Sequence, residues 1–434
     1  AQASSPPAQQ LWHLRTNFGA TRADARNRVY AKYWNSELDC ASQMTSILLV
    51  APTGSPLQQL HRSWSDSRPR DSVTFLTDLG AVADTLNGRA WSVMLLDGSL
   101  PDQAASEVLA NAMDHHPNLI RLLVLPEDQG HVTNIQGAHQ VLPCREDIAY
   151  LDPVIDAALA VSAQIAGNER LARLVSRLQK VPSPPMLYFD LRDALESAQG
   201  DLEQIAEITS RDPGLTAQVL KIANSGFYAL PRSVSDLSDA IRLLGTDTLL
   251  SLVLAAHVFA GMPPPGMRLD VLWQHSAHVS ALARQIAEMD GAKRNDQGMC
   301  TVAGLLHDIG LLVLLENDSS TYQPLWNQTG GDEGELAELE RKTYGITHGE
   351  LGGLVLKLWT LPAPIVEAVN FSHRWDAPVN TPVAQAVMTA EWLLDLAGDG
   401  MPSADALPEF LSGTANDRLV SWMQFRDEVE EQVA

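Results

Sequence analysis

The chain has 434 residues, 45% of them hydrophobic, which predicts two or three domains with ordinary cores. It has 30 lysines and arginines but 53 aspartates and glutamates, which gives a formal charge of -23. Such a charge is repelled by the phosphate backbone of nucleic acids. We therefore expect no direct binding of nucleic acid. The absence of a long apolar run or a secretion signal predicts a soluble, cytoplasmic protein without a membrane anchor, and three scattered cysteines suit a reducing compartment.

The first half of the chain divides into an extension and an α/β region. Residues 1–45 begin with Ala, Gln, Ser and Pro and show no sustained period, so we expect a flexible extension. Over residues 46–152, short apolar runs alternate with helical segments, which predicts a parallel sheet with helices on both faces. The fold class of this region is therefore α/β, doubly wound and flavodoxin-like.

Asp97 follows the third expected strand, and Pro101 comes shortly after it. This arrangement resembles a response-regulator receiver domain, in which Asp97 would be the phosphoacceptor. The acidic pair that this family needs after the first strand is replaced by Ala51-Pro52, and its lysine is missing from residues 142–145. A phosphoryl group on Asp97 would lack charge neutralisation, so the resemblance implies a degenerate receiver. The simplest interpretation of Asp97 is a strand-end carboxylate.

Residues 153–180 show helical spacing before and after Gly167, which predicts a connecting helix. Its apolar stripe could pair with a second copy in a homodimer, or pack against its own domain. Strand signals then almost vanish, so we expect an all-helical region over 181–396, made of a bundle at 181–261 and further helices at 267–396. Residues 397–434 are expected to form an acidic helical tail.

The pair His307-Asp308 lies within the apolar run 302–315, which predicts a buried helix. A buried histidine and carboxylate must find partners, because lost solvation costs several kcal/mol. The two side chains therefore either bind a metal or form a hydrogen bond with each other.

Other residues could complete a site with this pair, since ligands from several helices suit a divalent metal in a helical bundle. The candidate metal ligands are His275, His307, Asp308, His348, His373 and Glu391. The metal would be Fe, Mn or Mg. A hydrogen-bond network that binds no metal is the competing interpretation. His278, one turn from His275, is expected to be packed rather than to be a ligand.

The run from residue 181 to about 396 resembles the HDOD family, a bacterial signalling module related to the metal-dependent HD phosphohydrolases. The matching stretches are Val181-Pro182, 212–220, Ala223-Asn-Ser225, 240–245, 273–276 and 304–310. The resemblance assigns His275 to the first HD histidine and His307-Asp308 to the namesake pair. It also implies that the signature residues either cap helices or form a partner surface; they are Asp212, Asn224, Ser225 and Gly245.

Several departures from the HD pattern count against catalysis. Glu391 replaces the closing aspartate, and Ser372 stands where relatives often carry a histidine. Leu311 occupies the position of a lysine that would bind substrate phosphate, and no Gly-Tyr-Pro motif follows His373. We also expect residues 328–334 to form an exposed loop.

The expected function is that of a cytoplasmic bacterial signalling regulator that acts by binding other signalling proteins, without turnover. One alternative is a metal-dependent phosphohydrolase acting on a nucleotide or cyclic nucleotide. Another is nucleotide binding without hydrolysis in the same pocket. The retained histidines keep both alternatives open.

Overall fold

The computed structural model describes most of the chain from residue 45 onward. The described residues are 45–433 without 69–70, 127–134, 146–149, 197–201, 224–233, 260–267, 331, 375–378, 380, 397–406 and 412–413. The expected extension 1–45 thus lies outside the described residues, apart from its last position. Residues from Met44 onward form one compact unit.

Five parallel strands form the sheet, in the order β2-β1-β3-β4-β5. They are β1 (Ser46–Val50), β2 (Ser72–Leu76), β3 (Val93–Asp97), β4 (Ile120–Leu125) and β5 (Gln140–Pro143). This is the flavodoxin-like strand order. The parallel sheet expected from the sequence is confirmed, and we call Ser46–Ala166 the sheet domain.

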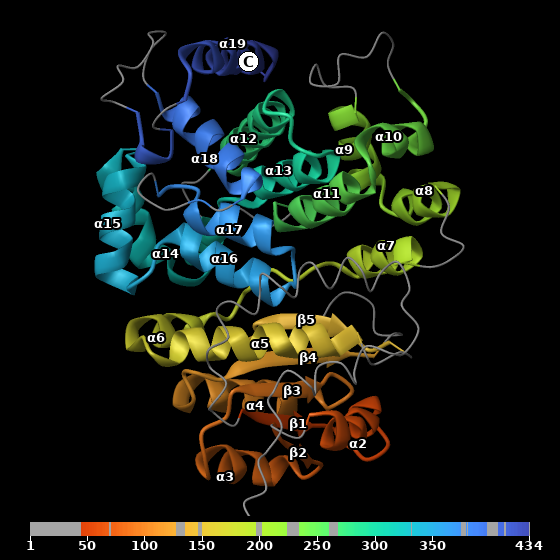
Figure 1. Cartoon of the computed structure of the whole chain (residues 1–434). Coiled ribbons are helices and arrows are strands. Elements are labelled where there is room, and N and C mark those ends of the chain that lie inside the picture. The colour runs from red at the N-terminus through yellow and green to blue at the C-terminus, as the bar shows by residue number, and fades with distance from the viewer. Residues whose placement is uncertain are drawn as a thin grey trace, which may run out of the picture. The chain divides into compact units, whose positions relative to one another are not determined.

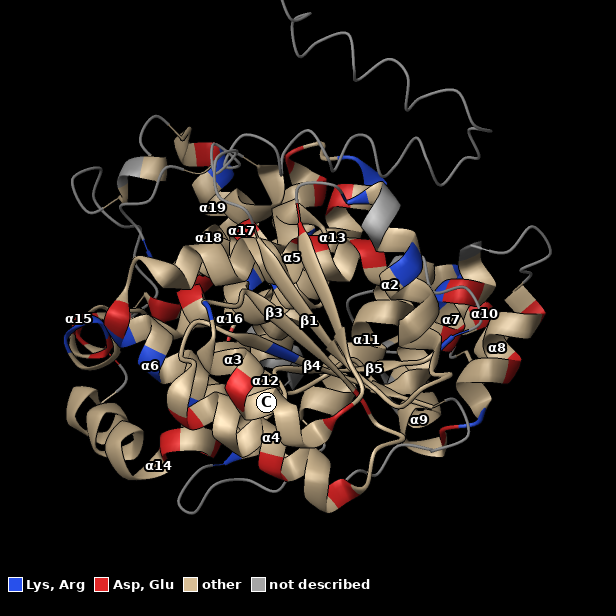
Figure 2. Cartoon of the chain, turned by 90° about the horizontal axis from the view of Figure 1, so that it is seen from below, with Lys and Arg blue, Asp and Glu red and all other residues tan. Residues whose placement is uncertain are grey.

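Alternate strand residues enter two cores on opposite faces of the sheet, as the period of two in a strand requires. Ile47 and Leu49 pack with α2 (Pro56–Ser67) and α5 (Leu151–Ala166). Leu48 and Val50 pack with η1 (Leu79–Ala81), α3 (Val82–Asn87) and α4 (Asp102–His115). The strands carry almost no charged residues. Most of the charged residues lie on the surrounding helices (Figure 2).

The expected connecting helix over 153–180 is two helices, α5 and α6 (Glu169–Arg177). Gly167 ends α5, and the Asn168 side chain begins α6 by accepting hydrogen bonds from the backbone N–H groups of Arg170 and Leu171. The apolar stripe of these helices is buried within the chain. This burial favours packing of the stripe against its own domain, and a homodimer stays a prediction.

The rest of the described chain is helical, as the sequence predicts (Figure 1). The helices are α7 (Met186–Glu196), α8 (Leu202–Ser210), α9 (Pro213–Ala223), α10 (Leu237–Leu244), α11 (Thr246–Val258), α12 (Leu269–Met289), α13 (Arg294–Leu306), α14 (Ile309–Thr329), α15 (Glu333–Tyr344), α16 (His348–Leu358), α17 (Ala363–Phe371) and α18 (Pro382–Asp395). After them come η5 (Glu409–Leu411) and α19 (Asn416–Val433).

The apolar run around His307 is buried, but it is not one helix. Helix α13 ends at Leu306 and α14 begins at Ile309, so the His-Asp pair lies at a junction. By length and composition, residues 294–329 could span a membrane, yet their apolar window is wholly buried within the protein, as in a core helix.

The expected acidic tail is helical over α19, and this helix packs against the rest of the chain. Leu419 and Trp422 are buried, because the helix packs against α12 and α18. Burial of a tryptophan and a leucine stabilises this contact by roughly 1.5 to 3 kcal/mol per side chain. The C-terminal segment is thus part of the helical core.

Candidate metal centre

Two glycines bring the His-Asp junction close to its neighbouring helices. A Cβ on Gly304 would lie 2.5 Å from the Ser280 Cα of α12, and a Cβ on Gly310 would lie 1.9 Å from the His348 carbonyl oxygen of α16. Only glycine permits such close backbone approach. As a result, α13 lies directly against the helix that carries His275, and α14 against the helix that begins with His348.

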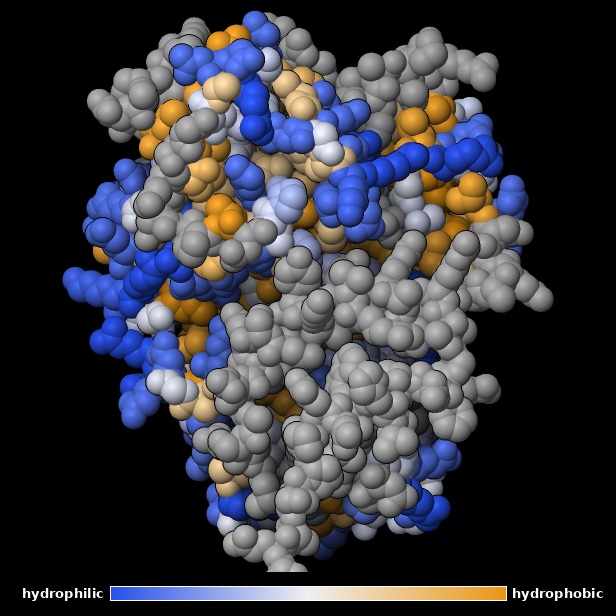
Figure 3. Space-filling view, viewed as in Figure 1, coloured by the Kyte–Doolittle hydropathy of each residue, from blue (hydrophilic) through white to orange (hydrophobic). Residues whose placement is uncertain are grey.

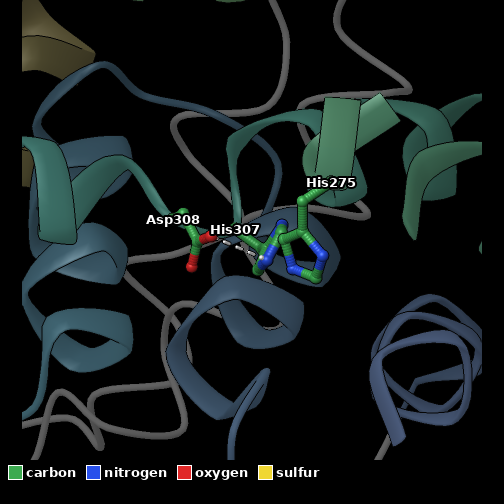
Figure 4. Close-up of side chains that lie close together, drawn as sticks. All are labelled: His275, His307 and Asp308. Carbon is green, nitrogen blue, oxygen red and sulfur yellow. Dashed lines mark ion pairs between the residues drawn. The ribbon is translucent and has the colours of Figure 1, made fainter. Parts of the chain in front are cut away.

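All six candidate ligands predicted from the sequence converge at this junction. In each of three overlapping groups, one ligand atom per residue lies within 4.8 Å of the others. The groups are His275, His307 and Asp308; His307, His373 and Glu391; and Asp308, His348 and His373. Figure 4 shows His275, from α12, beside the His307-Asp308 pair. His278 belongs to none of these groups.

Asp308 and Glu391 are the carboxylates that join the histidines. Asp308 Oδ2 lies 3.2 Å from His307 Nε2, and Asp308 Oδ1 lies 3.2 Å from His373 Nε2. Glu391 Oε1 lies 3.1 Å from His275 Nε2, and Glu391 Oε2 lies 3.5 Å from His307 Nε2. Two ligands of one ion at about 2.0 to 2.2 Å each can be separated by up to about 4.4 Å, so this spacing is compatible with coordination.

Hydrogen bonds outside this cluster orient two of the histidines. His307 Nδ1 lies 2.8 Å from the Gly304 carbonyl oxygen, and His348 Nδ1 lies 2.9 Å from Glu340 Oε1. Glu340 is itself buried and accepts hydrogen bonds from the Tyr322 hydroxyl and the His348 backbone N–H. With Nδ1 donating, Nε2 of each ring carries the lone pair and faces the cluster. A second nitrogen held in this way is typical of metal-ligating histidines.

Several buried ligand atoms take part in no hydrogen bond among the described residues. They are Nε2 of His307 and His348, Nδ1 of His373, and Oε2 of Glu333 and Glu391. Buried polar atoms without hydrogen bonds are rare, because each costs about 1 to 3 kcal/mol. These atoms approach one another at ion-pair distances, so a shared cation would satisfy them together. The residues present therefore fit a divalent metal.

Glu333 is a member of the cluster that sequence reasoning missed. Its Oε2 lies 3.7 Å from His373 Nδ1 and 4.0 Å from His348 Nε2. The exposed loop predicted over 328–334 is shorter in the structure: α14 ends at Thr329, Asp332 caps α15, and Glu333 lies in the first turn of that helix. An aspartate followed by acidic residues could have indicated this helix start.

Glu333 supplies a carboxylate near the place where Ser372 lacks a ligand. The buried Ser372 hydroxyl donates to the Val369 carbonyl oxygen, so it ends α17 and does not reach a metal. Leu311, in the position of the absent lysine, is fully buried in the core. Of the departures noted in the sequence, Ser372 and Leu311 thus have structural roles in this chain, whereas Glu391 lies in the cluster.

The charges of the cluster balance one another. Burial lowers the pKa of His275, but the Glu391 carboxylate outweighs burial and raises that pKa to about 9. Burial likewise opposes the charge on His373, while Glu333 and Asp308 raise its pKa well above the ordinary value. Burial raises the pKa of Asp308, yet His307 and His373 hold it well below its usual range. The raised histidine pKa values favour protonated imidazoles when no cation is bound, and a metal would have to displace those protons.

The remaining sequence candidates lie apart from this cluster. Asp97 is buried; it accepts hydrogen bonds from the Ser55 hydroxyl and, at 2.8 Å, from the Ser99 N–H. Asp212 caps α9 through the Leu215 N–H, and Gly245 joins α10 to α11 with a φ of 88°. These are structural roles. The other two signature residues, Asn224 and Ser225, lie outside the described residues.

The comparisons with known proteins identify the helical region. The family model of the HDOD domain matches residues 181–375. An uncharacterised protein of Treponema pallidum is 22% identical in an alignment of 264 residues that covers 58% of this chain and 49% of that protein. The match thus spans about half the length of this relative.

Solved structures resemble the chain with TM-scores below 0.5. An HDOD domain protein of unknown function from Geobacter sulfurreducens is 22% identical, with 60% of this chain and 97% of that chain covered and a TM-score of 0.46. A Shewanella amazonensis protein provisionally described as a metal-dependent phosphohydrolase is 20% identical, with 62% and 98% covered and a TM-score of 0.44. The domain assignment rests on the family match.

Proposed function

Residues 181–375 form an HDOD domain, and we propose that the chain is a signalling regulator whose HDOD domain holds a divalent metal without catalysing turnover. The observation that carries this proposal is the set of buried nitrogen and oxygen atoms that approach one another without hydrogen bonds. A network built only for hydrogen bonding would leave fewer such atoms.

His275, His307, Asp308, His373 and Glu391 would hold the ion, and a bound divalent cation would neutralise the buried carboxylates. His348 and Glu333 extend the set on the side of α15 and α16. The histidines also act on the fold. Because they come from α12, the α13–α14 junction, α16 and the end of α17, their contacts fix these elements relative to one another.

The limited exposure of the cluster supports a role without turnover. The side chain of His275 is 33% exposed, whereas those of His307 and Asp308 are 0% and 6% exposed. The neighbouring cation Arg374 lies 3.4 Å from Glu350, which places it in an ion pair. His275 is the most exposed of the described cluster residues, and Leu311, which stands where relatives carry a lysine, is buried in the core and offers no cation to a phosphate. Regulation through other signalling proteins fits this geometry better than hydrolysis.

A metal-dependent phosphohydrolase is the second candidate function. It is favoured by the number of ligands, since Glu333 adds a third carboxylate to those of Asp308 and Glu391. Three carboxylates and four histidines would suffice for two ions, an arrangement used by many phosphatases.

The test is a search for turnover in the full chain loaded with Mn²⁺ or Fe²⁺. Nucleotides, cyclic nucleotides and a chromogenic phosphodiester are assayed with the wild type and with Asp308→Asn, and thermal unfolding confirms that the variant folds. We expect metal-dependent stabilisation and no turnover in the wild type. Metal-dependent hydrolysis that disappears in folded Asp308→Asn would replace the regulatory proposal with the enzymatic one.

A further inference from the structure

A cleft outside the metal centre combines basic side chains with an apolar floor. Its volume is about 800 Å³, and residues of α4, α6, α14 and α15 line it. This volume lies within the range of sites for small ligands. Four basic residues, Arg170, Arg173, Arg177 and Lys342, face two acidic residues, Asp114 and Asp318. The cleft therefore reverses the balance of the chain, in which acidic residues prevail.

The three arginines lie on one face of α6. Their spacing of three and four residues aligns them along about two helical turns, or roughly 10 Å. The opposite face of α6 is buried through Leu171 and Val175. The arginines thus form a row that can contact more than one phosphate group of a single ligand.

Two of the cations are free to bind a ligand. Among the described residues, none pairs with the Arg177 guanidinium or the Lys342 ammonium group. Arg173 pairs with Glu169 at 3.6 Å, but both side chains are largely exposed, and such surface pairs are weak. On the acidic side, Asp318 already accepts a hydrogen bond from the Tyr344 hydroxyl at 3.1 Å.

Hydrogen bonds fix both ends of α6 against the HDOD domain. Near the N-terminus, Arg170 donates to the Lys342 carbonyl oxygen at 3.1 Å. Beyond the C-terminus, Asn317 Oδ1 accepts from the backbone N–H groups of Gln179 and Lys180 at 2.8 and 3.0 Å. The cleft between these contacts is therefore preorganised, which lowers the entropy cost of binding.

Leu174 and Leu178 contribute apolar surface to the cleft. In Figure 3 the surface over α15 is largely hydrophilic. A polar rim around an apolar floor is typical of sites that bind an amphipathic small molecule. A planar ring could pack on the leucines while the guanidinium groups form paired hydrogen bonds with phosphate oxygens.

We propose that this cleft binds a nucleotide that carries two or more phosphates. The phosphates lie along Arg173, Arg177 and Lys342, and the base lies over Leu174 and Leu178. The cleft is also lined by Met113 and Asp114 of α4, so a ligand that contacts α4, α6 and the α14–α15 region strengthens the connection between the sheet domain and the HDOD domain. This site is separate from the metal centre and does not depend on the function proposed for it.

Isothermal titration calorimetry of the full chain with ATP and with GTP tests the proposal. Sodium tripolyphosphate probes the phosphates alone, and adenosine probes the ring alone. We expect saturable binding of at least one nucleotide and weaker binding of tripolyphosphate and adenosine. No saturable binding of ATP or GTP in the millimolar range would overturn the proposal. Tripolyphosphate or adenosine that binds as tightly as the nucleotide would also overturn it.

The double substitution Arg173→Ala with Arg177→Ala locates the binding. We expect the double variant to bind the nucleotide at least about tenfold more weakly, because each arginine supplies charge-assisted hydrogen bonds. Arg62→Ala, an exposed arginine of α2, is the matched control and should bind as the wild type does. Asp308→Asn should also bind normally. Binding that survives the double substitution but is lost in Asp308→Asn would place the nucleotide at the metal centre and contradict this inference.

Discussion

Glu340 Oε1 lies 2.9 Å from His348 Nδ1, and this contact leaves His348 Nε2 facing Asp308 at 3.6 Å. Both side chains are buried, and Glu340 also accepts a hydrogen bond from the His348 backbone N–H at 2.9 Å. The carboxylate thus fixes both the tautomer and the orientation of the ring. This relationship makes Glu340 a positioning residue for the metal centre.

Glu340→Gln should therefore weaken metal binding without removing a ligand. Loss of such an outer carboxylate costs about 10- to 100-fold in metal affinity. Competition with a fluorescent chelator measures the Kd for Mn²⁺. Glu338→Gln, at an exposed position of the same helix, is the control and should leave the Kd unchanged. Equal Kd values for Glu340→Gln and the wild type would mean that His348 does not contribute to the site.

Gly310→Ala should strongly destabilise the chain, because the added Cβ would lie 1.9 Å from the His348 carbonyl oxygen. We expect a loss of roughly 3 kcal/mol in the free energy of unfolding, measured with urea. Gly167→Ala meets nothing within 4 Å and should change that free energy by less than about 0.5 kcal/mol. If both variants unfold at the urea concentration of the wild type, then α14 and α16 do not pack as closely as described.

A third prediction concerns the pH dependence of stability. His139 is buried; its Nδ1 accepts from the Arg121 backbone N–H at 3.0 Å, and its Nε2 lies 2.8 Å from the Val175 carbonyl oxygen. Burial, and then the Arg121 charge, hold the pKa of His139 well below its ordinary value, so the folded chain keeps this ring neutral. The unfolded chain binds a proton below about pH 6.5, and the contribution of His139 to stability therefore falls as the pH falls.

Urea denaturation of the wild type and His139→Gln at several pH values between about 5 and 8 checks this. The difference in the free energy of unfolding between the wild type and His139→Gln should be constant above about pH 6.5. Below that pH it should shrink by up to about 1.4 kcal/mol per pH unit. The metal centre is the same in both proteins, so its own titration cancels in the difference. An advantage that grows on acidification would show that the folded chain protonates His139.

Asp97 should not accept a phosphoryl group. Its oxygens are engaged by the Ser55 hydroxyl and the Ser99 N–H, and Ala51 and Pro52 stand where a receiver would bind Mg²⁺. Acetyl phosphate with excess Mg²⁺ should leave the intact mass of the chain unchanged. A gain of one phosphate that Asp97→Asn abolishes would contradict the interpretation of a degenerate receiver.

The sheet was predictable from local patterns, whereas part of the site was not. Strands such as Val93–Asp97 are apolar up to their last residue because both faces of the sheet are covered. His307-Asp308 was found because polar residues in a buried run need partners. Glu333 and Glu340 gave no such local signal, since they reach the cluster only through the packing of α15 against α14.

The break between α5 and α6 was also hard to predict. Gly167 and Asn168 can be accommodated within a helix at a small cost, but in the structure Gly167 ends α5 and the Asn168 side chain caps α6. The junction at His307-Asp308 shows the same limit, because the apolar pattern continues across it. Periodicity thus predicted the buried faces correctly, but it did not predict the helix ends.

The metal content of the full chain, purified without chelator and measured by inductively coupled plasma mass spectrometry, tests the central claim most directly. We expect at least one equivalent of a divalent transition metal per chain in the wild type and in the control His278→Ala. Asp308→Asn, which changes the carboxylate shared by two of the ligand groups, should lose that metal. A wild-type chain that holds no metal as purified, and takes up none when offered Mn²⁺ or Fe²⁺, would show that these buried histidines and carboxylates only hold one another.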